Sequence, residues 1–118
     1  MNIFTAMRRR LGPDGVNWIK GSVGSSGGPV CLLGAARVCA GYSLYSVFQG
    51  EEGGDQFKRA TLLMQRKIVA KYGYDMPSPY GSDTTGIATF NDAEETTFSD
   101  IEWLLGECES DPDAPQVP

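Results

Sequence analysis

The chain has 118 residues, of which 41% are hydrophobic, and it carries a net charge of −5. This length suits one domain and this hydrophobic content can form a core, which excludes a globally disordered chain. The acidic balance argues against a dedicated nucleic-acid-binding domain, because such domains are usually basic.

The first predicted element is a short amphipathic helix over residues 2–11. Three consecutive arginines, Arg8 to Arg10, lie near its C-terminal end, where cations complement the helix dipole. The sequence Gly-Pro-Asp-Gly at 12–15 is typical of a turn. Residues 16–28 are compatible with a short hairpin or with an irregular segment, and the second half is a Gly/Ser loop.

A second, almost wholly apolar helix is predicted over residues 30–40, with Pro29 in its first turn. A helix that is apolar on all sides is typical of the buried centre of a domain. Gly34 within it would let a neighbouring element approach closely. Residues 42–48 favour a short helix, with a strand as the alternative.

The longest predicted helix covers residues 56–72, with Asp55 as its N-cap and Gly73 as its stop signal. Residues 74–86 form a long connection with two prolines and two glycines. A last helix is expected from Thr97 to about Cys108. It would begin with an approximate capping box, in which Asp100 is the third helical residue.

The charges are sorted along the chain. Residues 1–74 hold all ten Lys and Arg and four acidic residues, whereas residues 75–118 hold the other eleven acidic residues and no base. The basic side chains Arg66, Lys67 and Lys71 could therefore form a binding surface for phosphates. We instead expect pairing of the basic helix with the acidic C-terminal third, and no direct binding of nucleic acid.

One cysteine could carry chemistry. Cys31 lies near the start of a predicted helix, where backbone N–H groups and the helix dipole can lower a thiol pKa. The chain contains no histidine to act as its base, and Asn91 or Asp92 would replace an imidazole poorly. We therefore predict that Cys31 is a buried, inert core residue, and keep catalysis by Cys31 and Asp92 as the alternative.

The acidic residues near the last helix do not follow a metal-binding pattern. Asp92, Glu94, Glu95 and Asp100 lack the spacing of a calcium loop. Asn91, Asp92 and Thr97 are better explained as turn and capping residues that fix how the last helix begins. The Gly/Ser loop lacks the spacing of a phosphate-binding loop, so we expect neither a metal nor a cofactor.

The location of the protein is also an expectation from the sequence. No basic stretch followed by a long apolar run opens the chain, and no run approaches the ~20 apolar residues that span a bilayer. We therefore expect a cytoplasmic protein without a signal peptide or a membrane span.

Several short motifs occur together in this chain. They are Trp18, the run Cys31-Leu32-Leu33-Gly34-Ala35, residues 87–92 and Thr97. This combination resembles a family of small uncharacterised proteins of actinobacteria and their bacteriophages. Members show a Cys-Leu-x-Gly-Ala helix start, a later aromatic-Asn-Asp motif and a Thr-capped final helix. Phe90 stands where tryptophan is commoner in the family. The resemblance implies a helical fold and, for a phage protein, the host cytoplasm, and it implies no activity.

The sequence thus predicts a mainly α, compact single domain over residues 1–108, followed by a flexible, acidic, Pro-rich tail over residues 109–118. The function expected is a non-enzymatic module for protein interaction, such as a phage or actinobacterial accessory factor that binds a host or virion protein. One alternative is a small cysteine-dependent enzyme that uses Cys31 with Asn91 and Asp92. Another is an acidic mimic of nucleic acid that inhibits a DNA-binding protein.

Overall fold

Helices dominate the part of the chain that the computed structural model describes, which is residues 1–25, 27–44, 54–73 and 85–118. The α-helices are α1 (Ile3–Leu11), α2 (Leu32–Cys39), α3 (Gly54–Tyr72), α4 (Thr85–Asp92) and α5 (Phe98–Glu109). A 3-10 turn, η1 (Pro13–Gly15), follows α1. The described ranges contain isolated β-bridges but no strand, so the prediction of a mainly α single domain is confirmed. None of the described helices is long and apolar enough to cross a membrane.

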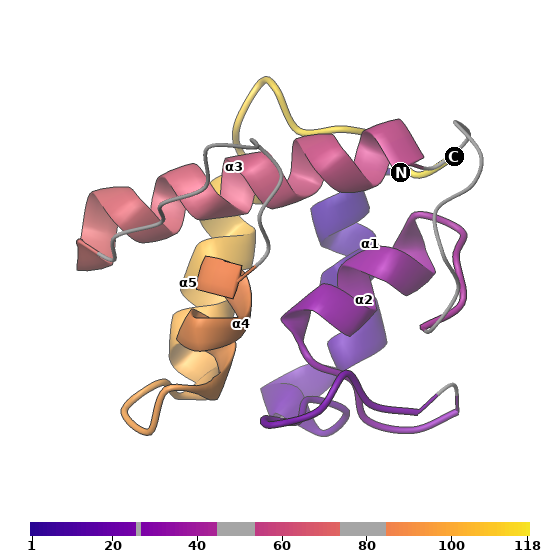
Figure 1. The fold of residues 1–118 in the computed structure, drawn as a ribbon. Helices are drawn as coiled ribbons and strands as arrows, with labels where there is room; N and C mark the ends of the chain where they lie inside the picture. Colours follow the sequence, from indigo (N-terminus) through magenta and orange to yellow (C-terminus); the bar gives the residue numbers. More distant parts are fainter. Residues whose placement is uncertain (26, 45–53, 74–84) are drawn as a thin grey trace.

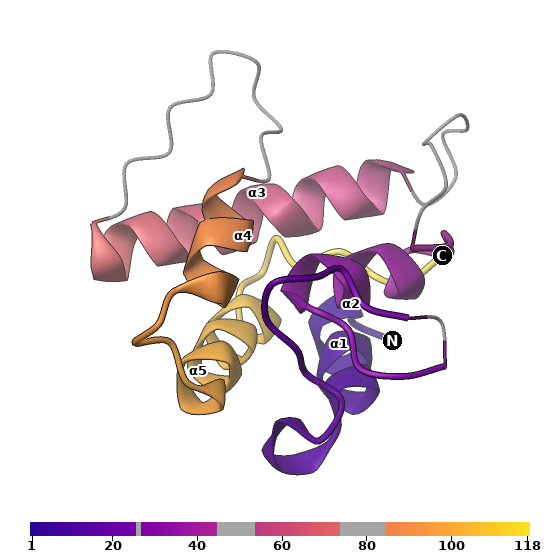
Figure 2. The ribbon, with the colours of Figure 1, turned by 60° about the horizontal axis from the view of Figure 1, so that its bottom comes forward.

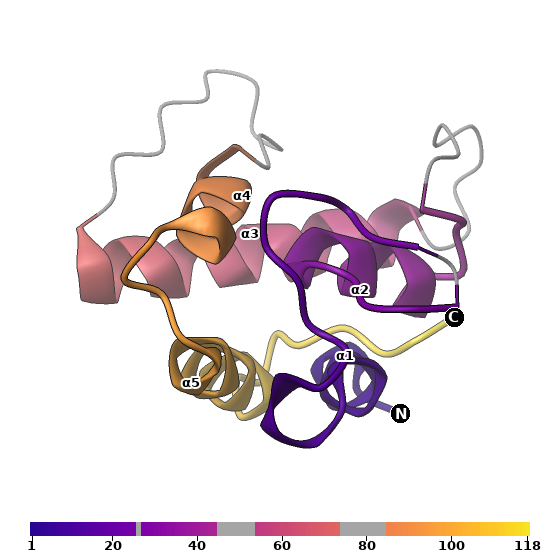
Figure 3. The same ribbon diagram turned by 90° about the horizontal axis from the view of Figure 1, so that it is seen from below.

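The long helix α3 lies across the other four helices (Figure 1). Seen from below, α1 and α5 point toward the viewer side by side, with α3 behind them (Figure 3). In this arrangement α1 packs against α2 and α5, while α3 packs against α2, α4 and α5. One side of α3 therefore faces the helices beneath it, and the opposite side is left outside the core.

A single hydrophobic core joins the five helices. Its largest fully buried members are Phe4, Phe90, Ile3, Met7, Leu11, Leu32, Met64, Ile68, Ile87, Ile101, Leu104 and Leu105. On α3 the buried positions recur every three or four residues, which is the spacing of one helical face. Burial of this face on α1, α2, α4 and α5 is the main source of stability for a helix of this length.

The start of α2 differs from the prediction, since α2 begins at Leu32 and Cys31 is its N-cap. The reason is that the backbone N–H groups of Val30 and Cys31, the two residues before α2, form hydrogen bonds outside the helix. The N–H of Val30 donates to the Asn17 carbonyl at 2.8 Å, and the N–H of Cys31 donates to the Val23 carbonyl at 3.1 Å. These bonds hold the chain extended, so Pro29 lies outside the helix. They also make the described residues 16–25 and 27–30 an irregular segment with isolated β-bridges.

Gly34 allows the close approach that its sequence position predicts. A Cβ atom at this residue would lie 2.5 Å from the Val23 carbonyl oxygen, a backbone atom that cannot move aside easily. The segment before α2 is thereby packed directly onto the first turn of α2. Glycine at this position is explained by packing.

Other element boundaries also differ from the prediction. Asp55 lies within the first turn of α3 and is not its N-cap, because α3 already begins at Gly54. Gly73 ends this helix as predicted, with a φ of +69°. Residues 42–44 are not helical, and the rest of the helix predicted at 42–48 lies outside the described residues. Of the predicted connection 74–86, the last two residues already belong to α4, and the others lie outside the described residues.

The C-terminal segment is packed against the domain, which differs from the loose tail predicted at 109–118. The tail runs from α5 alongside α3 to the N-terminus (Figures 1 and 2). There Ile3 donates its N–H to the Pro115 carbonyl at 2.9 Å, and Val117 donates to the Met1 carbonyl at 2.8 Å. The first N–H groups of a helix have no hydrogen-bond partner within the helix. The Pro115 carbonyl of the tail supplies such a partner for the N–H of Ile3, the first residue of α1. Pro115 is buried as a result.

Candidate functional site

Two of the predicted motif residues, Trp18 and Asn91, meet at the end of α4. Asn91 is 1% exposed, and its Oδ1 accepts hydrogen bonds from Trp18 Nε1 at 2.7 Å and from the Leu32 N–H at 3.1 Å. Its Nδ2 donates to the Ile19 carbonyl at 3.2 Å and to Asp92 Oδ1 at 2.8 Å. We call these contacts the Asn91 network. They join α4, the segment before α2 and the first residue of α2.

Asp92 and Lys20 extend this network at the surface. Asp92 Oδ1 also accepts from the Gly21 N–H at 2.8 Å, and Lys20 Nζ donates to the Ala93 carbonyl at 2.6 Å. A cation beside the last carbonyls of α4 complements the dipole of that helix. Asn91 and Asp92 therefore anchor residues 18–21 and α2, whereas the sequence predicts that they hold the turn into the last helix.

The surroundings of Cys31 determine whether its thiol can act as a nucleophile. Its side chain is 7% exposed, which confirms the prediction that it is buried, and its Sγ accepts a hydrogen bond from the Gly34 N–H at 3.3 Å. Burial raises the pKa of the Cys31 thiol, more than its backbone hydrogen bonds lower it, and the nearby Asp92 charge raises it further. Because the thiolate is the nucleophilic form, this site is poorly suited to attack on a substrate.

The other two cysteines have the same character. Burial raises the pKa of Cys39 to about 11 and that of Cys108 to about 12, so both thiols stay protonated at neutral pH. All three cysteines are free. In the described part of the chain, no three Cys, Asp or Glu side chains gather closely enough to hold a metal ion.

Thr97 is the N-cap of α5, as predicted. The Asp100 carboxylate accepts hydrogen bonds from the Thr97 N–H at 2.8 Å and from the Thr97 hydroxyl at 3.1 Å. It also accepts from the Tyr72 hydroxyl at 3.0 Å, which ties the start of α5 to the end of α3. The backbone hydrogen bond from Thr97 is the main reason why the pKa of Asp100 is lowered.

Two of the three predicted binding residues are used inside the molecule. Lys67 Nζ lies 3.1 Å from Asp111 Oδ2, and Lys71 Nζ lies 3.8 Å from the centre of the Trp103 ring. The first contact joins the basic part of the chain to its acidic third, as does the ion pair of Arg8 with Glu109 at 3.7 Å. For Lys67, the expected pairing of the basic helix with the acidic C-terminal third is confirmed.

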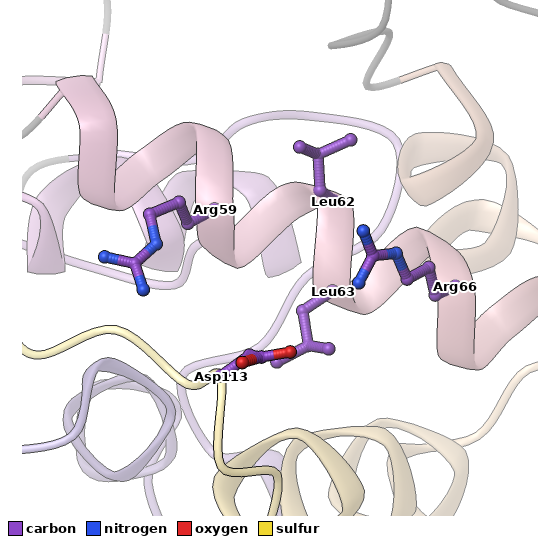
Figure 4. A pocket seen from close by; sticks show the side chains of 5 residues that line it. All are labelled: Arg59, Leu62, Leu63, Arg66 and Asp113. Carbon is purple, nitrogen blue, oxygen red and sulfur yellow. The ribbon is translucent and has the colours of Figure 1, made fainter.

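The third predicted residue, Arg66, lies beside a groove between α3 and the tail. The groove has a volume of about 250 Å³, and we call it the α3 groove. It is lined by Arg59, Leu62, Leu63, Arg66 and Asp113. Figure 4 shows the two arginines on either side of the two leucines, with Asp113 facing them from the tail.

The outward side of α3 also carries exposed apolar side chains. Leu62 is 36% exposed and Val69 is 41% exposed. With the exposed residues Arg59 and Arg66, they recur every three or four positions and so share one face of the helix. We call these four residues the outer stripe of α3.

Its charge marks Arg66 as a binding residue in the sequence, whereas the other residues of this site are not among those predicted. Arg59, Leu62 and Val69 could have been found from their helical spacing, because they lie opposite the core-forming residues of α3. Asp113 carries no comparable signal, since its Pro-rich surroundings favour a loose tail. The ion pair of Lys67 with Asp111 and the hydrogen bonds between the tail and α1 hold Asp113 beside α3.

Comparisons with known proteins identify a family but no related activity. No match was found among curated proteins or among solved structures. A family model described as a family of unknown function, DUF6197, matches residues 1–110, which is almost the whole chain. The protein therefore belongs to the DUF6197 family.

Proposed function

We propose that the protein is a non-enzymatic interaction module that binds another protein through the outer stripe of α3. From the resemblance to proteins of actinobacteria and their phages, we further propose an accessory role in the bacterial cytoplasm. The bound protein would belong to the host or to a virion.

The observation that carries this proposal is the composition of the outer stripe. Leu62 and Val69 are exposed, although the other large apolar residues of α3, such as Met64 and Ile68, are buried. The two exposed residues alternate with arginines along the helix, and Leu62 borders the α3 groove. Arginine is enriched in protein interfaces, and apolar side chains that face water gain free energy when a partner covers them.

The alternative of a cysteine-dependent enzyme has less support. The Cys31 thiol is buried and its pKa is raised. The side-chain amide of Asn91, the residue proposed to assist it, already makes hydrogen bonds to Trp18, Ile19, Leu32 and Asp92. A catalytic amide would have to give up some of these bonds to reach a substrate.

The alternative of an acidic nucleic-acid mimic is also less well supported. Such a mimic needs carboxylates spread over one face without bases between them. Two acidic residues near the C-terminus, Glu109 and Asp111, instead pair with Arg8 and Lys67. These pairs neutralise part of the acidic third within the fold.

Photo-crosslinking in the cell tests the proposal. We would replace Leu62 by a photoreactive phenylalanine analogue and irradiate actinobacterial cells that make the protein. As the matched control, the same analogue would replace Val16, which is 67% exposed and lies away from α3. We expect a discrete adduct with one cellular protein from position 62 and none from position 16. Equal adducts from both positions, or none from position 62, would refute binding through α3.

A further inference from the structure

The α3 groove has features that define the chemistry of a partner. We propose that it binds an acidic, amphipathic helix, whose carboxylates contact Arg59 and Arg66 on either side of an apolar side chain that packs on Leu62. This inference rests on the proposed function and adds the kind of segment that the partner presents.

The spacing of the two arginines fits a helical partner. Arg59 and Arg66 are seven residues apart, which is two turns or about 10 Å along α3. A second helix with acidic residues seven positions apart presents its carboxylates at the same spacing. An apolar residue between them would meet Leu62 and the groove below it, as a helix in a groove does.

Both guanidinium groups are available for such contacts. Arg66 forms no ion pair or hydrogen bond with the residues that the structure describes. Arg59 has an ion pair with Asp55 at 4.0 Å, in which both side chains are more than half exposed. Such exposed pairs within one helix are weak, so a partner can replace this one at little cost. Lys67 and Lys71, by contrast, are already engaged.

The same charges argue against two other occupants. In a second copy of the chain bound by the same stripe, four arginines would meet in one interface, with no carboxylate from either stripe to pair with them. A nucleic acid presents closely spaced phosphates along its whole length, and some of these would approach Asp113 in the groove. An acidic helix can place its carboxylates at the two ends and leave an apolar side chain opposite the centre.

Fluorescence anisotropy with synthetic probes tests this inference. The probe is a fluorescent peptide of about 16 residues, long enough to form a helix, with glutamates seven positions apart and leucines between them. A peptide with lysines in place of the glutamates and a short DNA duplex serve as comparisons. We expect the acidic peptide to bind most tightly at low salt, and its affinity to fall as salt rises.

Charge variants show where the peptide binds. R66E should weaken binding about tenfold, because an attractive contact becomes a repulsive one. R9E changes the net charge equally on α1 and should leave the affinity unchanged. D113N removes the negative charge from the groove and should strengthen binding about threefold. Unfolding midpoints in urea check that each variant is folded.

Several results would overturn the inference: no binding of the acidic peptide, preference for the lysine peptide or the duplex, or equal losses with R66E and R9E. In any of these cases, a cross-linked adduct at Leu62 would still support protein binding through α3, with a partner of different chemistry. Absence of that adduct would refute the proposed function itself. The two failures are therefore distinguishable.

Discussion

The Asn91 network and the outer stripe of α3 are two polar regions of one small domain, and their polar groups are satisfied in opposite ways. Asn91 is buried, and both the oxygen and the nitrogen of its amide make two hydrogen bonds inside the molecule. Among the described residues, no buried side-chain N or O atom lacks a partner. Arg66 in the outer stripe lies at the surface and forms no ion pair with them.

This difference separates residues that build the fold from residues that can bind. A buried, fully bonded amide fixes how three segments meet, and its groups have no capacity left for a ligand. An exposed guanidinium beside exposed leucine has that capacity. We therefore assign the Asn91 network to stability and the outer stripe to binding. The following experiments test this assignment.

The largest effect is expected for Asn91→Ala. The substitution leaves the buried Leu32 N–H and the partly buried Trp18 N–H and Ile19 carbonyl without their partner, and each unsatisfied group costs free energy. We expect the free energy of unfolding to fall by about 3 kcal/mol, measured by urea denaturation.

Glu94→Ala, an exposed change three residues further on, is the control and should cost less than about 0.5 kcal/mol. If Asn91→Ala costs no more than this control, the structural role of the network is wrong, and a functional role for Asn91 gains support.

Removal of residues 114–118 should have the next largest effect. The deletion removes buried Pro115 and the backbone hydrogen bonds of the tail with Met1 and Ile3. We expect a loss of about 2 kcal/mol of unfolding free energy, since apolar burial and hydrogen bonds are lost together. The control is Gln116→Ala, which shortens an exposed side chain and keeps the backbone. An unchanged urea midpoint for the deletion would restore the loose tail that the sequence predicts.

Asp100→Asn is expected to have a smaller effect. An amide oxygen accepts hydrogen bonds more weakly than a carboxylate, so the links to Thr97 and Tyr72 are weakened but keep their geometry. We expect a loss of about 1 kcal/mol at neutral pH, with Ser99→Ala as an exposed control on the same turn.

The same substitution has a distinct pH dependence. The pKa of Asp100 is lower in the folded protein than in the unfolded chain, mainly because of the backbone hydrogen bond from Thr97. Its contribution to stability is therefore complete above the unfolded pKa, and is lost as pH falls through the lower, folded pKa. Below about pH 4 the difference between the variant and the native chain should shrink. A difference that stays constant down to acid pH would contradict the assignment.

The smallest effect on stability is expected for Arg66→Glu. Its side chain is exposed and has no ion pair in the described structure, so the unfolding free energy should change by less than about 0.5 kcal/mol. Lys67→Glu is the informative comparison, because it removes an existing pair with Asp111 and places two acids together. It should destabilise the protein more than Arg66→Glu does. Equal losses would mean that Arg66 has a structural role.

The sequence predicts the helices better than the contacts between them. Helical spacing locates α1, α3 and α5 to within one or two residues, since their buried faces recur with the period of a helix. The predicted start of α2 is wrong because the N–H groups of Val30 and Cys31 donate to the carbonyls of residues 17 and 23. The sequence around residue 30 does not indicate these hydrogen bonds. The packed tail is missed for the same reason.

The candidate site follows the same pattern. Charge alone selects Arg66, Lys67 and Lys71 equally, although two of them are already engaged by Asp111 and Trp103. These partners lie more than 30 positions away in the chain, so no local motif predicts the contacts. The burial of Cys31 is predicted correctly, because its neighbours in the sequence are apolar.

Binding through the outer stripe of α3 is tested by the yield of the photo-crosslinked adduct at Leu62 in three chains. Arg66→Glu alters the outer stripe, whereas Cys31→Ser removes the thiol and keeps a side chain that can cap α2. We expect an adduct in the native chain and in Cys31→Ser, and its loss in Arg66→Glu. Loss in Cys31→Ser with retention in Arg66→Glu would contradict binding through α3 and favour thiol chemistry.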